Sequence, residues 1–222
     1  MSNLSRRKLL QLGAATVVSS VPMPEGRHIS AEERANLHSA LGESIAAGWK
    51  LFHTAGNAQV LAVGQALLYL VQQNHSLLSS RERSKFYSSV YNLIGSALLF
   101  QGHYEDAVDA HINAHIAALG SGDAWEVTQG LICQANGYQS LRQYHNAFQA
   151  LEEALHTIGN PIDETRLRSK AHLLACWADN AIMAGEKTIA EEKLHASAEY
   201  LEQIFSGTYM LCFSQSSLLE HL

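Results

Sequence analysis

The sequence predicts an all-α fold assembled from repeated helical hairpins, and three observations support this. The motif Gly102–Ala107 returns forty residues later as Arg142–Ala147, and a fixed period of this size is the signature of a repeat architecture. The three prolines are Pro22, Pro24 and Pro161, so the long stretch between the second and the third contains none of the strongest helix breaker. Alternating β-branched runs, which would indicate strands, are scarce.

Each copy reads as a helix, a short turn and a second helix. The first helices are predicted from the apolar runs Val90–Phe100 and Gly130–Leu141. Small residues recur where two helices would cross closely, at Gly95, Ala107, Ala114, Ala135, Ala147 and Ala154. Tyr104 and Tyr144 lie at the turns, and we expect them to wedge between the paired helices.

This pattern resembles the tetratricopeptide repeat, in a variant whose period of 40 exceeds the family's usual length of about 34. The second copy matches the family at Ala135, Tyr138, Ala147 and Ala154, whereas the first has Leu98 where an aromatic is usual. The resemblance implies a right-handed α-solenoid of helical hairpins. It also implies that the first helix of each unit lines a concave groove that binds a peptide or a partner helix.

A weaker third copy follows the second. Ala171–Ala184 and Thr188–Phe205 are predicted helices, and Trp177, Ala178 and Ala190 keep the register at a spacing of 43. The resulting organisation has four parts: a signal-like or linker segment at 1–29, an N-terminal capping or degenerate hairpin at 30–79, three repeats at 80–205, and a half-unit or tail at 206–222.

The predicted N-terminal hairpin starts at a capping box. Ser30 is followed three residues later by Glu33, the arrangement in which the two residues cap each other's backbone N–H groups. Apolar residues then recur at helical spacing from Leu37 to Phe52, and Val60–Val71 forms the second helix.

Composition argues against nucleic-acid binding and catalysis. The net charge is −6, and the chain lacks the basic stripe that direct nucleic-acid binding by these repeats would need. No nucleophile elbow, phosphate loop or kinase signature is present, so we expect no enzyme activity and no cofactor. The acidic residues Glu105, Asp106, Asp109, Glu152 and Glu153 are expected to form solvated helix faces.

The histidines and cysteines do not form a metal-binding pattern. His111 and His115 share a helix face, but no glutamate follows His111 and no third ligand is placed by spacing, so we expect no metal. Cys133 and Cys176 occupy the same repeat position and are predicted to be small core fillers.

The N-terminal segment supports two interpretations. Ser5–Gln11 followed by apolar residues to Val21 resembles a twin-arginine export signal over residues 1–22, and this run is too short for a stable membrane span. The same stretch resembles the linker of bacterial regulators in which a DNA-binding head precedes a repeat tail. The first interpretation predicts an exported protein, and the second, which we favour, predicts a cytoplasmic one.

The resemblance implies a set of groove residues at the exposed positions of the first helices: Asn92, Ser96, Gln129, Asn136, Gln139, His172 and Asp179. Their amides suit a peptide backbone, since Asn and Gln both donate and accept hydrogen bonds. We therefore expect a non-enzymatic scaffold that binds a protein or peptide and serves as the sensing part of a bacterial regulatory system. The alternative is a structural scaffold that forms homo-oligomers and has no groove ligand.

Overall fold

The computed structural model describes residues 30–54, 57–160 and 163–206. Within these ranges the helices are α2 (Ala31–Phe52), α3 (Asn57–Gln73), α4 (Ser80–Phe100), α5 (Tyr104–Ser121), α6 (Ala124–Ser140), α7 (Tyr144–Ile158), α8 (Glu164–Ala184) and α9 (Lys187–Ser206). No strand occurs in the described ranges, so the all-α class is confirmed. The predicted segment 1–29 and the predicted tail beyond Ser206 lie outside the described residues.

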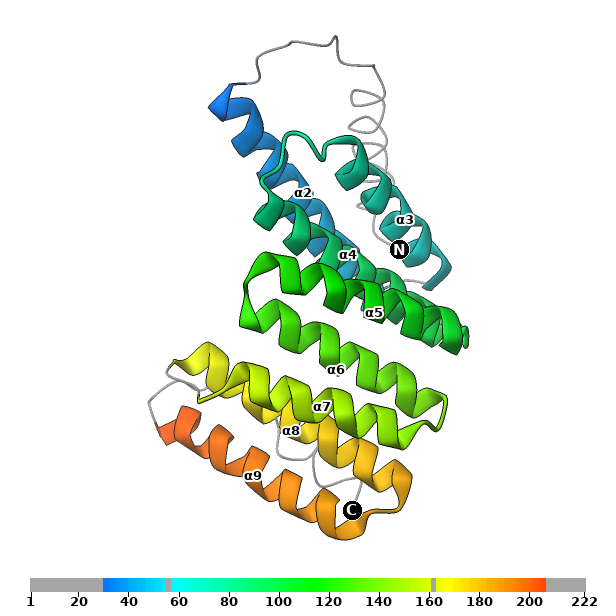
Figure 1. The fold of residues 1–222 in the computed structure, drawn as a ribbon, viewed down its shortest axis with the longest axis vertical. Helices are drawn as coiled ribbons and strands as arrows, with labels where there is room; N and C mark the ends of the chain where they lie inside the picture. Colours follow the sequence, from blue (N-terminus) through cyan, green and yellow to red (C-terminus); the bar gives the residue numbers. More distant parts are fainter. Residues whose placement is uncertain (1–29, 55–56, 161–162, 207–222) are drawn as a thin grey trace. The chain divides into compact units, whose positions relative to one another are not determined.

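The chain divides into two compact units, residues 1–157 and residues 158–222. In the first unit successive helices contact one another from α2 to α6, and α4 also contacts both α2 and α6. The α5–α6 and α6–α7 turns lie at opposite ends of the helices, so α5 and α7 run in the same direction (Figure 1). In the second unit α8 packs against α9. This packing confirms a repeat-like succession of helices.

The small residues predicted at the helix crossings are buried. Ala107, Ala114, Ala135, Ala147 and Ala154 have no exposed surface. Two glycines show how closely the helices approach, because an added Cβ would lie 2.5 Å from His111 Cε1 at Gly95 and 2.8 Å from Val108 Cγ2 at Gly137. Interior packing leaves no room for such a group without rearrangement. The small residues therefore let α5 approach α4 and α6 closely.

The turn after α4 recurs after α6 and α8. Its left-handed residue is Gly102 (φ 82°), Arg142 (φ 58°) or Gly185 (φ 82°). The next residue in each turn donates a backbone hydrogen bond of 2.8–3.0 Å to the carbonyl five residues earlier: His103 to Leu98, Gln143 to Tyr138, and Glu186 to Ala181. This is the Schellman pattern of helix C-termini. The third copy, weak in sequence, thus shares the local backbone structure of the first two.

Capping boxes start two helices. The Ser30 N–H donates to Glu33 Oε2 at 2.8 Å and the Glu33 N–H donates to Ser30 Oγ at 3.1 Å, which confirms the predicted start of α2. Ser79 and Glu82 form the same reciprocal pair before α4, at 2.9 and 3.2 Å. Each cap satisfies N–H groups that have no partner within the helix.

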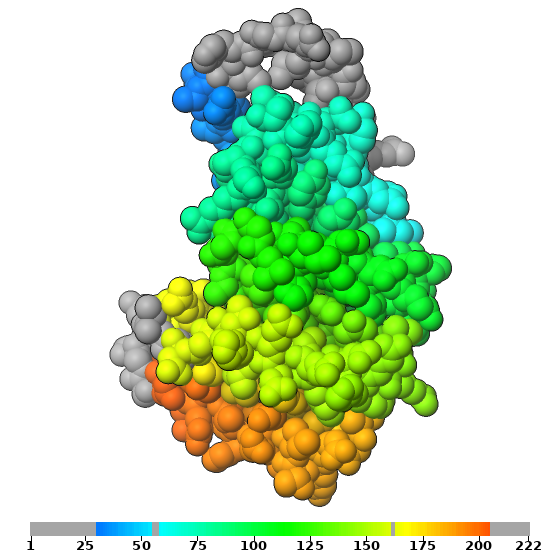
Figure 2. All heavy atoms as spheres, viewed as in Figure 1, coloured from blue at the N-terminus to red at the C-terminus, as the bar shows by residue number. Residues whose placement is uncertain are grey.

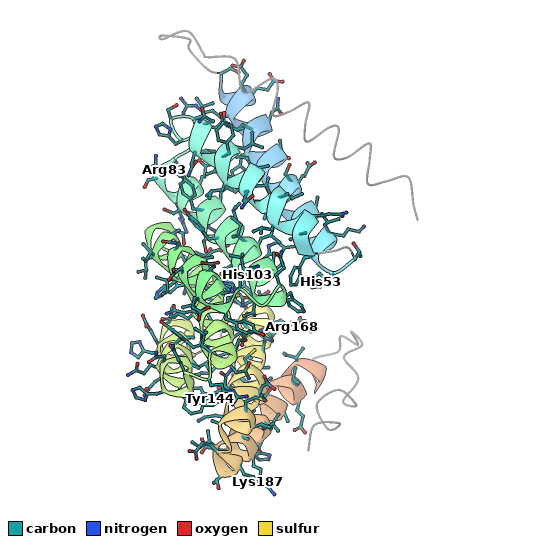
Figure 3. All side chains as sticks on the ribbon, turned by 90° about the vertical axis from the view of Figure 1, so that its right-hand side faces the viewer. His53, Arg83, His103, Tyr144, Arg168 and Lys187 are labelled. Carbon is teal, nitrogen blue, oxygen red and sulfur yellow. The ribbon has the colours of Figure 1, made fainter. Side chains whose placement is uncertain are left out.

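Tyr104 is the first residue of α5, and Tyr144 is the first residue of α7. Figure 3 labels Tyr144 and His103, the residue before Tyr104. Tyr104 keeps 39% of its surface exposed, so it is not enclosed between the two helices as predicted. Tyr144 is half-buried.

The second unit is held together by α8 and α9 alone among the described helices. Ser197 Oγ donates to the Ala171 carbonyl at 2.8 Å, and the Lys193 ammonium lies 4.7 Å from the centre of the Trp177 ring. Ala178 and Ala190, which keep the repeat register, are buried. None of the helices in the described ranges has the length and apolar character needed to cross a bilayer.

Candidate functional site

The predicted groove residues fall on three helices. Asn92 and Ser96 lie on α4, and the next three lie on α6: Gln129, Asn136 and Gln139. Helices α4 and α6 contact each other within the first unit. His172 and Asp179 lie on α8 in the second unit, where both are exposed.

Four of these residues form what we call the α4/α6 polar strip: Ser96, Gln129, Asn136 and Gln139. All four are partly exposed, and they belong to two helices in contact. The strip contains no charged side chain. Gln129 Nε2 is buried and has no hydrogen-bond partner among the described residues. An amide nitrogen without a partner is costly when buried. Because the rest of Gln129 is partly exposed, an outward turn of its side chain would let a ligand supply the missing acceptor.

Asn92 is not part of this strip, which corrects the prediction. It is 4% exposed, and its Oδ1 lies 3.3 Å from Nδ1 of the buried His111. The repeat register explains the difference, because forty residues separate Asn92 from Ile132, which is 2% exposed. The position that corresponds to Gln129 in the first copy is Ser89, which is half-buried.

His111 packs in the interior of the first unit. It is 1% exposed, and burial lowers its pKa to about 4. The imidazole is therefore neutral near pH 7 and hydrogen-bonds to Asn92 across the α4–α5 contact. Gly95 makes the space for this ring, since all three of its nearest neighbours are ring atoms of His111.

A charged group lies where α4 meets the start of α6. Lys85 Nζ lies 2.6 Å from Asp123 Oδ2, and this hydrogen bond lowers the pKa of Asp123. Asp123 also caps α6 by accepting from the Trp125 N–H at 3.1 Å. Burial, and then the nearby Asp123, raise the pKa of Glu126. Sequence reasoning missed this group, although Asp123 three residues before Glu126 has the form of a helix N-terminus.

The two described cysteines differ despite their shared repeat position. Both are half-buried, and burial raises the pKa of the Cys133 thiol to about 12. Cys176 Sγ lies 3.6 Å from Nε2 of the exposed His172, so it is not solely a core filler. Within the described ranges, no three His, Cys, Asp or Glu side chains gather as metal ligands would.

A separate pocket of about 590 Å³ lies between α2, the loop before α4 and the first turn of α4. Its lining includes Arg34, His38, Ser76, Ser79 and Glu82. Glu82 Oε2 is already held by the Ser79 backbone, and Glu82 Oε1 lies 3.8 Å from His38 Nε2. One cation and one carboxylate therefore face the same space, and the pocket has no clear preference for ligand charge.

A comparison of the chain with protein-family models, curated proteins and solved structures gives no match. Its function must be inferred from the chemistry of the described surfaces. Of these, the α4/α6 polar strip combines partial exposure, two helices in contact and a buried amide without a partner.

Proposed function

We propose that this chain is a non-enzymatic, tetratricopeptide-like repeat protein that binds an extended peptide or protein segment through its first helices. In this proposal the hairpins form a right-handed α-solenoid, and the α4/α6 polar strip lies on its concave side. The resemblance of the N-terminal Ser-Arg-Arg stretch to the linkers of bacterial regulators supports a role as the sensing part of such a system.

The observation that carries the proposal is the unsatisfied Gln129 amide within an uncharged polar strip. Gln129 and Asn136 can each donate and accept hydrogen bonds. They can therefore bind both the N–H and the C=O groups of a peptide backbone, whatever the peptide's sequence. The contact between α4 and α6 brings the polar residues of two successive hairpins onto neighbouring helices, which supports one binding surface rather than isolated polar groups.

The test is selection of peptides from a random display library on the immobilised full chain, followed by fluorescence anisotropy with the enriched peptides. Removing two amide contacts by Gln129→Ala with Asn136→Ala should cost about 0.5–1.5 kcal/mol each, or roughly 5- to 150-fold in affinity. The melting temperature should stay within about 2 °C of the wild-type value, since both side chains are partly exposed and surface changes are usually within about 0.5 kcal/mol.

A matched control removes two exposed amides elsewhere in the first unit, by Gln65→Ala with Gln149→Ala, and should leave affinity unchanged. Equal affinity of the strip variant and the wild type would refute the proposed surface. A chain that enriches no peptide and self-associates in light scattering would instead identify the scaffold alternative.

A further inference from the structure

Helix α5 presents an unusual solvent-facing side, which we call the α5 outer face: Glu105, Asp106, Asp109, Asn113, Ile116 and Leu119. All six residues are exposed, and Ile116 and Leu119 remain 61% and 59% exposed despite being large and aliphatic. Positions seven apart return to the same helix face, so Asp109 and Ile116 point the same way. The atoms of α5 are in view in Figure 2, in green near the middle of the first unit.

The charges on this face are unbalanced. Neither α5 nor α7 contains a lysine or an arginine, and none of Glu105, Asp106 and Asp109 makes an ion pair with another described residue. Glu105 and Asp106 suit the first turn of a helix, where the N-terminal dipole favours acids. That local role does not extend to Asp109, nor does it explain the two exposed aliphatics a further two turns along.

The α5 outer face is therefore acidic in its first half and apolar in its second. One segment of this chain has the complementary order: Arg6, Arg7 and Lys8 are followed at once by Leu9, Leu10 and Leu12. We propose that residues 5–12 dock on the α5 outer face of the same molecule. The three cations would meet the three carboxylates, and the leucines would cover Ile116 and Leu119.

The connecting chain is long enough for this contact. Residues 13–29 span up to about 55 Å when extended. Helix α4 contacts both α2 and α5, so the axis of α5 lies two helix packings from the axis of α2, or about 20 Å. The 18 residues of α5 add about 27 Å of length. Any point on the α5 outer face is therefore within reach of residue 12.

Tethering also favours the chain's own segment over a foreign one. A tether of this length raises the effective concentration of a segment, so even a weak contact is well populated. The charge component of such an exposed contact should weaken as salt rises, because ions screen charges separated by more than about 10 Å at 0.1 M. Docking in this form would keep the leucines out of water and would be released by a stronger competitor.

The experiment is photo-crosslinking within the full chain, with a benzophenone amino acid in place of Leu10, followed by mass spectrometry of the monomer fraction. We expect crosslinks within residues 105–119. Charge reversal of the segment by Arg6→Glu, Arg7→Glu and Lys8→Glu should lower their yield at least fivefold at 50 mM salt.

Reversing the face by Glu105→Lys, Asp106→Lys and Asp109→Lys should lower the yield equally. Combining both sets of reversals should restore it, an outcome that simple loss of structure would not produce. The matched control reverses three acids of the second unit, Glu186, Glu199 and Glu202, and should leave the yield unchanged.

Three outcomes would overturn the inference. Crosslinks that fall elsewhere, or that ignore both charge reversals, would show that the complementarity is accidental. Crosslinks between two chains whose yield rises with concentration would make a second copy the occupant. An absence of crosslinks would show that the segment does not visit the face.

Discussion

The packing of Gly95 against His111 leads to a quantitative prediction. A Cβ on residue 95 would lie 2.5 Å from His111 Cε1, 2.7 Å from Nδ1 and 2.8 Å from Nε2. The imidazole is 1% exposed, so a shift of the ring would disturb its buried neighbours. Gly95→Ala should therefore overpack the α4–α5 contact at a cost of about 1–3 kcal/mol.

That cost is offset in part by helix propensity, since alanine is favoured over glycine by about 1 kcal/mol in a helix interior. Gly42→Ala on α2 isolates this gain, because a Cβ at position 42 would have nothing within 4 Å. The two variants make the same chemical change in the same kind of backbone. Gly95→Ala should be less stable than Gly42→Ala by about 1–3 kcal/mol, or roughly 2–10 °C in melting temperature.

The repeat itself supplies the compensating change. Forty residues after Asn92, Gly95 and His111 stand Ile132, Ala135 and Leu151, which are 2%, 0% and 0% exposed. Transplanting the second copy into the first gives Asn92→Ile with Gly95→Ala and His111→Leu. Changing all three together avoids an unpartnered Asn92 amide, which would cost about 1–3 kcal/mol when buried.

Thermal and urea unfolding monitored by circular dichroism would measure these differences. We expect the triple variant to recover at least the stability that Gly95→Ala loses. If Gly95→Ala gains as much as Gly42→Ala, the close contact with His111 does not limit packing. If the triple variant is no more stable than Gly95→Ala alone, the two copies are not structurally equivalent at this crossing.

Two further predictions concern protonation and the turns. Because burial lowers the pKa of His111 to about 4, the unfolded chain binds the additional proton between its ordinary value of about 6.5 and pH 4. The free energy of unfolding should therefore fall by up to about 3 kcal/mol as pH decreases through this window. Urea unfolding of His111→Leu should not show this decrease. Identical pH profiles for the variant and the wild type would contradict the prediction. Arg142 adopts φ 58° at the position where Gly102 adopts φ 82°, a left-handed conformation that strains a residue with a side chain. Arg142→Gly should therefore stabilise the chain, and Gly102→Arg should destabilise it, each by about 1 kcal/mol. Opposite shifts in the urea midpoint would show that backbone strain is not the controlling factor.

The features that sequence predicted well depend on local patterns. The capping box at Ser30 needs only two residues three positions apart, and the structure contains both of its hydrogen bonds. The buried alanines follow from a period that constrains every copy at once. A box of the same kind at Ser79 was overlooked, although its pattern is equally local.

The site was harder to predict, for two different reasons. Asn92 was placed in the exposed set by the register of the tetratricopeptide resemblance, although the forty-residue period aligns it with the apolar Ile132, which is buried. That error was avoidable from sequence alone. The pair between Lys85 and Asp123 was not, because the two residues are 38 apart and meet only when α4 packs against α6. The raised pKa of Glu126 depends on the same packing.

The two surfaces proposed to bind chain segments differ in chemistry, and this makes them separable. The α4/α6 polar strip has no charged side chain, so a ligand held by its amides should lose little affinity as salt rises. The α5 outer face has three carboxylates without ion-pair partners among the described residues, so its contact with residues 5–12 should weaken steeply over the same range. Because the strip lies on α4 and α6 and the outer face lies on α5, a segment released from α5 need not compete for the strip. A salt titration of peptide binding and of crosslink yield on one sample would therefore distinguish independent surfaces, whose curves differ, from a single shared one, whose curves coincide.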